Sequence, residues 1–378
     1  MDTQRPGCPI EYLNIQIKGS NEEKRSMPFK RSRYDKRTGF SPNNPRQQLN
    51  EATPFIDGSA IYGTSKTWTD CLREFKGGRL KADNPYKKIY EQFPTNNDMA
   101  LPFVNYPTTK LHMLRPVSRY FKIGNRQGFE NPFLLAISVI WFRWHNYIAH
   151  NISHSHPEWD DEKIFQAARR KVIAYQQKIT MYDFLPRLLK IDENLNTYEI
   201  PKYTNEGGSR NVSIYNGYRS DINPAIAQEF QSAAMRFGHT IVPPGIWVRG
   251  PKRQSDCNWG FHNISLHDRK YKTRAIRLCN QYWNSQNKLK NMFDSVLRGM
   301  ASSLASMEDT IMEPDLREFV YGPLEFSRRD LAAIDIQRGR DHGVSDYLTV
   351  RKTYCGHMDT LCDYKLKGNK DIVRVHLI

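Results

Sequence analysis

Long apolar runs are absent from this sequence of 378 residues. Its longest apolar stretch runs from Phe133 to Phe142 and is shorter than the roughly 20 residues that a membrane-spanning helix needs. The first residues also lack a basic segment followed by an apolar run, which is the pattern of a secretory signal. We therefore expect neither a transmembrane anchor nor a signal peptide in this chain.

Cysteine is scarce, and the six cysteines include no CxxC pair. The absence of a secretory signal would by itself predict a cytosolic chain. Two other features favour an exported fold. One is the cysteine pattern, and the other is a set of Asn-x-Ser sequons, a pattern that also arises by chance in many chains of this length. The sequons begin at Asn151, Asn211 and Asn263. We interpret the chain as a fragment or alternative product of a longer, exported protein.

Acidic residues are outnumbered, because 56 Lys and Arg face 40 Asp and Glu and give a net charge of +16. The basic residues are spread along the chain, and none lies in the aromatic-interleaved motifs typical of nucleic-acid binding. We therefore predict a solvated basic face and no nucleic-acid partner. A hydrophobic content of 39% with 25% charged residues is typical of a soluble globular protein, and the length suits one large domain or two ordinary ones.

Helical periodicity dominates the middle of the chain. Residues 1–52 are rich in Pro, Asn, Lys and Arg, and they predict an extended segment that wraps a core beginning near Thr53. A buried helix is predicted over residues 131–150 and a second helix over residues 160–189, with a stop at Pro186. We expect these two helices to pack side by side. Residues 190–222 show no clear period and favour a loop or short hairpin.

A further helix is predicted to run from Asn223-Pro224 toward His239. The run Val242-Pro243-Pro244-Gly245 ends it, which leaves His239 in the last turn, facing inward. Two more helices are predicted over residues 287–307 and 330–340. In the first of them, one face is apolar and consists of Leu289, Met292, Phe293, Val296 and Leu297. Because there is no internal repeat and no strand-rich region, the predicted fold class is mainly α with short β-hairpins.

Several short stretches carry the most specific patterns in the sequence. In chain order they are Pro28 to Asp35, Asp57 to Gly63, Gly124-Asn125-Arg126, Asn131 to Leu135, Trp141 to Asn146, Ala234 to Thr240 and Gln337 to Gly343. Together, and in this order, they resemble the animal haem peroxidases, and within that family the extracellular peroxidase-like domain of the dual oxidases. The resemblance covers residues 8–356. It implies an incomplete haem peroxidase-like helical domain over residues 53–356, followed by a divergent tail over residues 357–378.

The resemblance implies that His239 is the proximal ligand of haem iron. Arg236 matches an arginine near a haem propionate, where a guanidinium fits a carboxylate in a bidentate manner, and Gly238 would let the backbone approach the porphyrin. At position 335 the family usually carries Asn, which accepts a hydrogen bond from the proximal imidazole. Asp335 would accept the same bond more strongly and favour ferric iron. Alternatively, Asp335 caps its helix or pairs with a nearby arginine, Arg338 or Arg340.

Two further residues match haem-site positions of the family. Arg126 resembles the distal arginine, a catalytic residue whose cation stabilises charge as the peroxide bond breaks; its spacing to Arg143 is one residue longer than is usual in the family. Glu130 matches a glutamate that can form an ester with haem. The alternative for Glu130 is an ordinary carboxylate at a helix N-terminus, just before Pro132.

The run from Thr53 to Ser59 resembles the calcium loop of the family. The resemblance implies that oxygen atoms of its first, third, fifth and seventh residues, Thr53, Phe55, Asp57 and Ser59, reach the ion. Calcium takes such oxygen ligands from side chains and backbone carbonyls together. A plain turn is the alternative. In active relatives a distal histidine, with an adjoining Asp that completes the calcium site, precedes this loop. The first histidine here is His112, so both groups are missing from residues 1–52 and we expect weak calcium binding at most.

Other histidines and cysteines leave alternatives open. The spacing of His150, His154 and His156 suits a metal only if it is helical, and we interpret all three as surface residues. The resemblance implies a disulfide between Cys257 and Cys279. The pairing of the remaining cysteines is not predicted; they are Cys8, Cys71, Cys355 and Cys362.

The leading hypothesis for function follows from the resemblance. It implies a domain that holds haem b and calcium and oxidises a phenolic donor, such as tyrosine, with hydrogen peroxide, at a cell surface or outside the cell. The implied protein partner is a dual-oxidase membrane module or a maturation factor. The alternative is a catalytically silent ectodomain that serves as a protein-interaction scaffold. A basic binding protein with a chance set of motifs is a third, weaker hypothesis.

Overall fold

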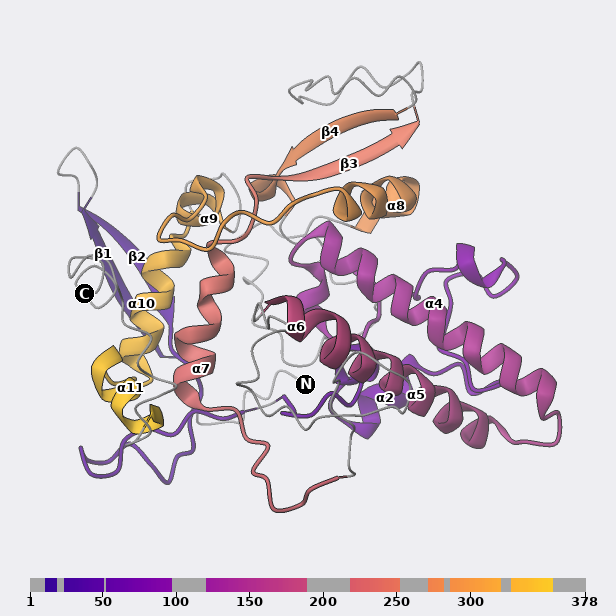
Figure 1. Ribbon diagram of the computed structural model, residues 1–378, viewed down its shortest axis with the longest axis horizontal. Coiled ribbons are helices and arrows are strands. Elements are labelled where there is room, and N and C mark those ends of the chain that lie inside the picture. Colours follow the sequence, from indigo (N-terminus) through magenta and orange to yellow (C-terminus); the bar gives the residue numbers. More distant parts are fainter. Residues whose placement is uncertain are drawn as a thin grey trace, which may run out of the picture. The chain divides into compact units, whose positions relative to one another are not determined.

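The computed structural model describes residues 11–18, 24–50, 52–96, 120–188, 218–251, 271–281, 286–320 and 328–355. The chain divides into two compact units, which we describe separately (Figure 1). The larger unit contains Met1–Glu51, Phe93–Ile140 and Ile226–Ile378, and the smaller unit contains Ala52–Gln92 and Trp141–Ala225. Helices dominate the described residues, and the strands form two hairpins, so the mainly α fold class is confirmed.

The first hairpin lies in the segment that the sequence predicts as extended. Strands β1 (Tyr12–Lys18) and β2 (Lys24–Lys30) pair antiparallel. Met27 and Phe29 are two residues apart, so they point to the same side of β2. Both are buried against Ile334 of helix α10 (Leu331–Asp341). The N-terminal segment therefore contributes to the core of the larger unit.

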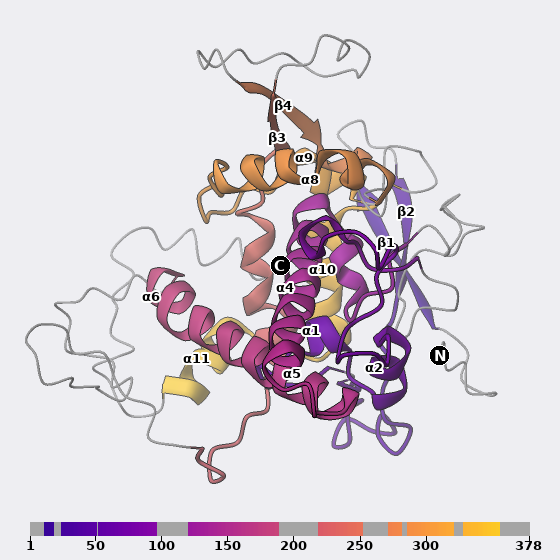
Figure 2. The same cartoon turned by 90° about the vertical axis from the view of Figure 1, so that its right-hand side faces the viewer.

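The second hairpin, β3 (Gly245–Pro251) with β4 (Tyr271–Arg277), lies over helix α8 (Gln286–Ala301) (Figure 2). The helix buries three residues of its predicted apolar face, Leu289, Phe293 and Val296. Gly299 lies where α8 contacts β3, since a Cβ at this position would stand 1.8 Å from the carbonyl oxygen of Trp247. The close approach of helix and strand thus requires glycine.

Helix α8 is shorter than predicted and ends at Ala301 instead of residue 307. The hydroxyls of Ser302 and Ser303 donate to carbonyl oxygens of the last turn, that of Ser303 to Gly299. The chain then leaves the helix, and the backbone N–H of Ser306 donates to Ile241. Serine hydroxyls that donate to the last carbonyl groups of a helix compete with the backbone N–H groups that would extend it. The spacing of apolar residues, from which the helix was predicted, does not show this competition.

Helix α10 confirms the helix predicted over residues 330–340. The carboxylate of Asp330 accepts the N–H of Ala333 as N-cap. Gly343, with a φ of +67°, follows the C-terminus, where the N–H of Val344 donates to Gly339. Two shorter helices flank α10 in sequence, and they are α9 (Pro314–Phe319) and α11 (Tyr347–Cys355).

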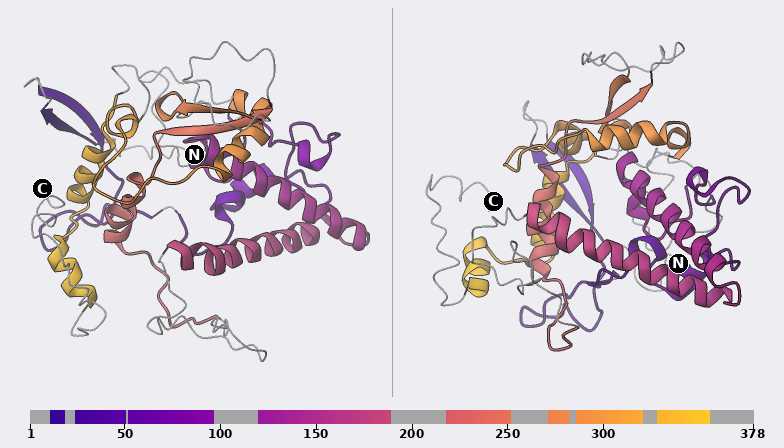
Figure 3. Two further views of the ribbon diagram at one scale, coloured as in Figure 1. Left: turned by 45° about the horizontal axis from the view of Figure 1, so that its top comes forward. Right: turned by 45° about the vertical axis from the view of Figure 1, so that its right-hand side comes forward.

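Helices α4 (Pro132–Ser155) and α5 (Asp161–Lys178) confirm the predicted pair. Asn131 caps α4 by accepting the N–H groups of Phe133 and Leu134, and α5 turns back alongside the second half of α4 (Figure 3). The rings of Trp144 and Tyr175 meet edge to face, with centroids 5.4 Å apart.

The predicted stop at Pro186 is wrong, because the helix continues through it. A π-helical segment (Ile179–Phe184) follows α5, and α6 (Leu185–Leu188) contains Pro186. The N–H of Leu185 donates to the carbonyl of Thr180, five residues back. Proline cannot donate the backbone hydrogen bond of a regular helix, and the wider turn stands directly before it.

A buried histidine ties the smaller unit together. The backbone carbonyl of Gly78 can only accept, so His145 Nε2 donates to it at 2.9 Å, and Nδ1 accepts the Tyr62 hydroxyl at 2.8 Å. Tyr62 belongs to α1 (Ser59–Tyr62), which is followed by α2 (Lys66–Leu72). Gly78 has a φ of +65°, and a Cβ there would stand 2.6 Å from the backbone nitrogen of Phe165. Complete burial lowers the pKa of His145 to about 4.

The remaining short elements are 3-10 helices and one α-helix. They are η1 (Ile89–Glu91), η3 (Arg126–Phe129), α7 (Gln228–Ser232), η5 (Ala234–His239) and η6 (Leu278–Asn280). None of the helices in the described part of the chain is long and apolar enough to cross a membrane.

We predict that Gly299→Ala destabilises the protein by about 1–3 kcal/mol, the usual cost of overpacking, because the new Cβ has to displace the Trp247 backbone. Gly339→Ala is the matched control, since Gly339 is also helical but a Cβ there meets nothing within 4 Å. The control should be neutral or stabilising by up to about 1 kcal/mol. Urea unfolding measures both, and equal effects would contradict the packing described for Gly299.

We predict that His145 makes stability depend on pH between about 6.5 and 4. In this window the unfolded histidine, with a pKa near 6.5, binds a proton that the folded protein excludes. The contribution of neutral His145 is therefore complete above pH 6.5 and is lost as the pH falls toward 4, by about 3 kcal/mol at most. His145→Gln should be less stable at pH 7 and should lose less stability between pH 7 and pH 4.5 than wild type. Parallel slopes in urea titrations would contradict this account.

Candidate functional site

The segment that carries His239 is not the continuous helix predicted from the sequence. Helix α7 ends at Ser232, Ala233 departs from helical geometry with φ −132° and ψ −66°, and the 3-10 helix η5 follows. His239 is the last residue of η5, and β3 begins at Gly245, so the predicted break just beyond the histidine is present. No glycine or proline marks the interruption at Ala233, so it could not be predicted from the residue pattern.

The structure brings His239 and Asp335 together from separate helical elements. His239 Nδ1 lies 2.5 Å from Asp335 Oδ2, and the two side chains are 24% and 13% exposed. Because a carboxylate accepts, the hydrogen stands on Nδ1 when the imidazole is neutral, and the lone pair stands on Nε2. Donation of the second ring N–H to a carboxylate is the usual arrangement for a histidine that binds a metal. The N-cap of α10 is Asp330, so Asp335 does not cap this helix.

Basic side chains surround this pair. Arg236 is half-buried, and its pKa is lowered, first by burial and then by the neighbouring Arg338, while Asp335 and Glu130 act in the opposite direction. Within the described residues, Arg338 Nε and Asp335 Oδ1 are buried without a hydrogen-bond partner. Buried polar atoms without partners are uncommon. The unpartnered Arg338 Nε and the two neighbouring guanidinium groups, those of Arg236 and Arg338, are suited to binding carboxylate groups of a ligand.

Gly238 has surroundings that agree with space for such a ligand. Among the described residues, a Cβ on Gly238 would meet nothing within 4 Å. Glu130 follows η3 and stands one residue before the α4 N-cap, Asn131. The structure describes only the backbone of Arg126, which begins η3.

His342 is a residue of this region whose role sequence reasoning missed. Its Nδ1 lies 2.7 Å from the hydroxyl of Ser232, and its Nε2 lies 2.7 Å from the hydroxyl of Ser32. The side chain of Gln228, on α7, donates to the His342 carbonyl. His342 therefore joins the end of α10 to α7 and to the segment after β2. His342 belongs to the run from Gln337 to Gly343, which resembles a family motif. Its side-chain contacts are with Ser232 and Ser32, which are distant in sequence, so the motif alone could not predict them.

The residues of the predicted calcium loop lie in one turn of the smaller unit. Thr53 Oγ1 accepts the N–H of Phe55 at 3.1 Å, and Asp57 Oδ1 accepts the N–H of Ser59 at 2.9 Å. The loop lines a hollow of about 270 Å³ together with Trp141, Gln176, Ile179 and Thr180. Calcium takes 6–8 oxygen ligands, and in the described ranges no three His, Cys, Asp or Glu side chains converge on one point. Calcium binding stays a prediction.

The cysteine and sequon predictions fall partly outside the described residues. Cys257, Asn211 and Asn263 are among the residues that the structure does not describe. Cys71 and Cys279 are described as free thiols, and burial raises the pKa of Cys279 to about 11. Asn151 lies on the exposed side of α4. The tail over residues 357–378 also lies outside the described residues.

Solved structures place the fold in the peroxidase class. Peroxidase A from Dictyostelium discoideum superposes with a TM-score of 0.67 at 26% identity, covering 91% of this chain and 61% of that chain. A fatty acid alpha-dioxygenase from Oryza sativa gives a TM-score of 0.58 at 17% identity, covering 91% of this chain and 55% of that chain. At the lower identity the likeness concerns the fold alone.

Sequence relatives define the family. The model of the animal haem peroxidase family matches residues 2–367, and the chain belongs to this family. Its curated relatives include Dual oxidase 1 of Caenorhabditis elegans, 40% identical over 94% of the chain, and Dual oxidase 2 of Homo sapiens, 38% identical over 92%. The chain spans 22% and 21% of these relatives' own lengths.

Proposed function

We propose that the chain is a haem-dependent peroxidase domain of dual-oxidase type, which oxidises a phenolic donor such as tyrosine with hydrogen peroxide. The observation that carries this proposal is the 2.5 Å hydrogen bond between His239 and Asp335, in a chain that belongs to the animal haem peroxidase family. The bond leaves Nε2 of His239 as the atom that can bind iron. The donor, the cell-surface location and association with a membrane module are part of the same proposal.

The residues around His239 fit haem b. His239 Nε2 would bind the iron, and Arg236 and Arg338 would pair with the propionate carboxylates. Arg338 Nε is a buried donor without a partner among the described residues, and Arg236 is a half-buried cation next to it. Glu130, whose charge acts on Arg236, is proposed to form the ester link with haem. Haem, when bound, would supply the two-electron chemistry that couples peroxide reduction to oxidation of the donor.

Asp335 determines the electronic character of the proposed ligand. A carboxylate that accepts from Nδ1 makes the imidazole a stronger electron donor than the amide usual in the family would, and this favours ferric over ferrous iron. Arg126 is proposed to stabilise negative charge on the peroxide side.

A catalytically silent protein-interaction scaffold is the second candidate function. A pure interaction module keeps the fold but needs no haem. The calcium loop is proposed for either function, because a cation there would stabilise the turn at Asp57 without taking part in the chemistry. Haem uptake separates the two functions.

We predict that titration of the purified chain with haem gives a Soret band at one equivalent, which collapses in His239→Ala. His156→Ala is the matched control and should bind like wild type, because His156 stacks on Trp159 and belongs to the smaller unit, whereas the proposed ligands belong to the larger unit. Free imidazole should restore part of the band in His239→Ala if the variant is folded. A wild type without specific haem uptake would support the scaffold, and a band that survives in His239→Ala would exclude this ligand.

We predict that Asp335→Asn raises the reduction potential of the haem-loaded protein by on the order of 60 mV, the value for a tenfold change in the ratio of ferric to ferrous binding. Asp341→Asn serves as control, because Asp341 is also a buried carboxylate of α10 but pairs with Arg31. The control should shift the potential much less. Spectroelectrochemical titration measures both, and equal shifts would indicate a general charge effect instead of a bond to the ligand.

A further inference from the structure

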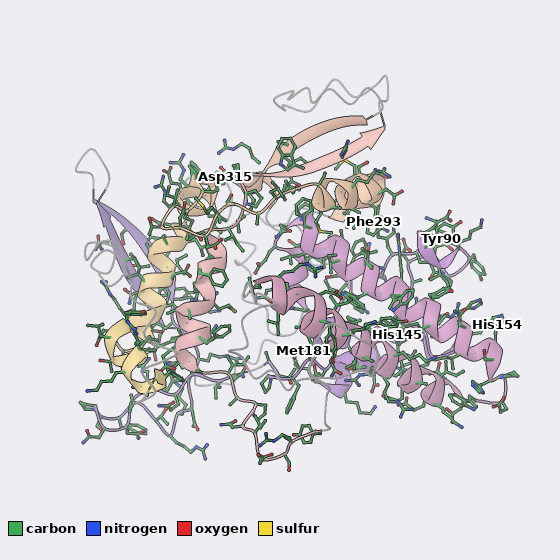
Figure 4. All side chains as sticks on the ribbon, viewed as in Figure 1. Tyr90, His145, His154, Met181, Phe293 and Asp315 are labelled. Carbon is green, nitrogen blue, oxygen red and sulfur yellow. The ribbon has the colours of Figure 1, made fainter. Side chains whose placement is uncertain are left out.

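Two exposed histidines lie on one face at the end of α4. His150 and His154 are four residues apart, a spacing that places side chains one above the other on a helix. Figure 4 labels His154 near the C-terminal end of this helix, beyond His145. His145 is buried and forms hydrogen bonds with Tyr62 and Gly78, whereas His150 and His154 are exposed to solvent.

The two exposed rings are close enough to share one ion. Their centroids are 4.1 Å apart, and their planes are inclined by 60°. Two imidazole nitrogens that bind the same ion, each at about 2.0–2.1 Å, lie roughly 3 Å from one another. Because His150 is exposed, its ring can turn toward Nε2 of His154 without moving the helix.

A backbone hydrogen bond prepares His154 as a ligand. Its Nδ1 lies 2.9 Å from the carbonyl oxygen of His150, and a carbonyl only accepts, so Nδ1 carries the hydrogen. The lone pair therefore stands on Nε2. Metal-binding histidines commonly make this bond to a carbonyl, which fixes the tautomer and the orientation of the ring.

His156 differs from this pair although it is next in the sequence. It follows the end of α4, its ring stacks on Trp159 with centroids 4.2 Å apart, and its Nδ1 lies 3.5 Å from a carboxylate oxygen of Glu158. The three histidines therefore divide into a helical pair, His150 and His154, and His156, which has its own partners.

We propose that His150 and His154 form a two-histidine chelate for a divalent transition metal. Imidazole nitrogens suit Cu²⁺, Ni²⁺ and Zn²⁺, and the general order of affinity places Cu²⁺ first. Within the described residues no third His, Cys, Asp or Glu joins them, so water or an external ligand completes the coordination and the metal exchanges readily. The position after His150 is Asn151, so the pair lacks the glutamate that serves as general base in zinc peptidases with the same histidine spacing.

The charge near the pair does not prevent cation binding. Arg79 acts electrostatically on His150, and its guanidinium lies 3.5 Å from a carboxylate oxygen of Glu74. This ion pair offsets the positive charge that an incoming metal ion would otherwise meet. The proposed site belongs to the smaller unit and is independent of the haem proposal, since neither His239 nor Asp335 takes part.

The test is binding of Cu²⁺ to the full chain, measured by competition with a chelator of known affinity and by electron paramagnetic resonance at one equivalent. Wild type should bind one Cu²⁺ with coupling to two imidazole nitrogens. His150→Ala and His154→Ala should each bind about a hundredfold more weakly and show one nitrogen, because the second imidazole no longer acts at high effective concentration. Far-UV circular dichroism confirms that these surface variants are folded.

Two controls make the test specific to the pair. His156→Ala removes a neighbouring histidine outside the pair and should leave the affinity within twofold of wild type. His154→Ala combined with Ser155→His keeps the number of histidines but moves one to a different side of the helix, so it should not restore binding. The proposal is overturned if His154→Ala retains wild-type affinity, if His156→Ala abolishes binding, or if the shifted histidine restores it.

Discussion

The hydrogen bond between His239 and Asp335 joins residues 96 positions apart, and the candidate site depends on the contacts that hold their two elements in place. His342 connects the end of α10 to Ser232 of α7 and to Ser32. Arg31 adds a 2.6 Å ion pair to Asp341 at the end of α10. The bond at the site thus depends on contacts among three segments of the larger unit: the end of α10, the segment after β2, and α7, which directly precedes η5.

The electrostatics of the same region explain why an anionic ligand suits it. Arg338 is close enough to Arg236 to disfavour the charge of Arg236, which also loses hydration through burial. Placing cations together without enough anions costs free energy. Carboxylate groups of a ligand would offset this cost. The basic cluster therefore supports the same ligand as the His239–Asp335 pair, by a separate physical argument.

The sequence predicted those parts of the structure that depend on local patterns. Apolar periodicity located α4 and α5, and the helix predicted over residues 330–340 corresponds to α10. Patterns that compete with local periodicity were missed. The serines after Ala301 shortened α8, and the π-helical turn allowed the chain to continue through Pro186.

The site was predicted through a specific motif, and its details required the fold. The motif around His239 and the run that contains Asp335 identified the pair, but their distance and tautomer come only from tertiary structure. The helix is interrupted at Ala233 without a glycine or proline, so this interruption could not be predicted. The role of His342 depends on Ser32 and Ser232, which are distant in sequence. For His150 and His154 the spacing was visible, whereas the helix, the ring separation and the bond to the carbonyl were not.

The most direct test of the proposed proximal pair is the iron–imidazole stretching vibration, measured by resonance Raman spectroscopy on the haem-loaded chain in the ferrous state. If His239 binds iron while donating from Nδ1 to Asp335, wild type shows this band, and the band moves to lower frequency in Asp335→Asn because the imidazole becomes a weaker donor. A wild-type spectrum without an iron–imidazole band, or identical bands in both proteins, would contradict the account.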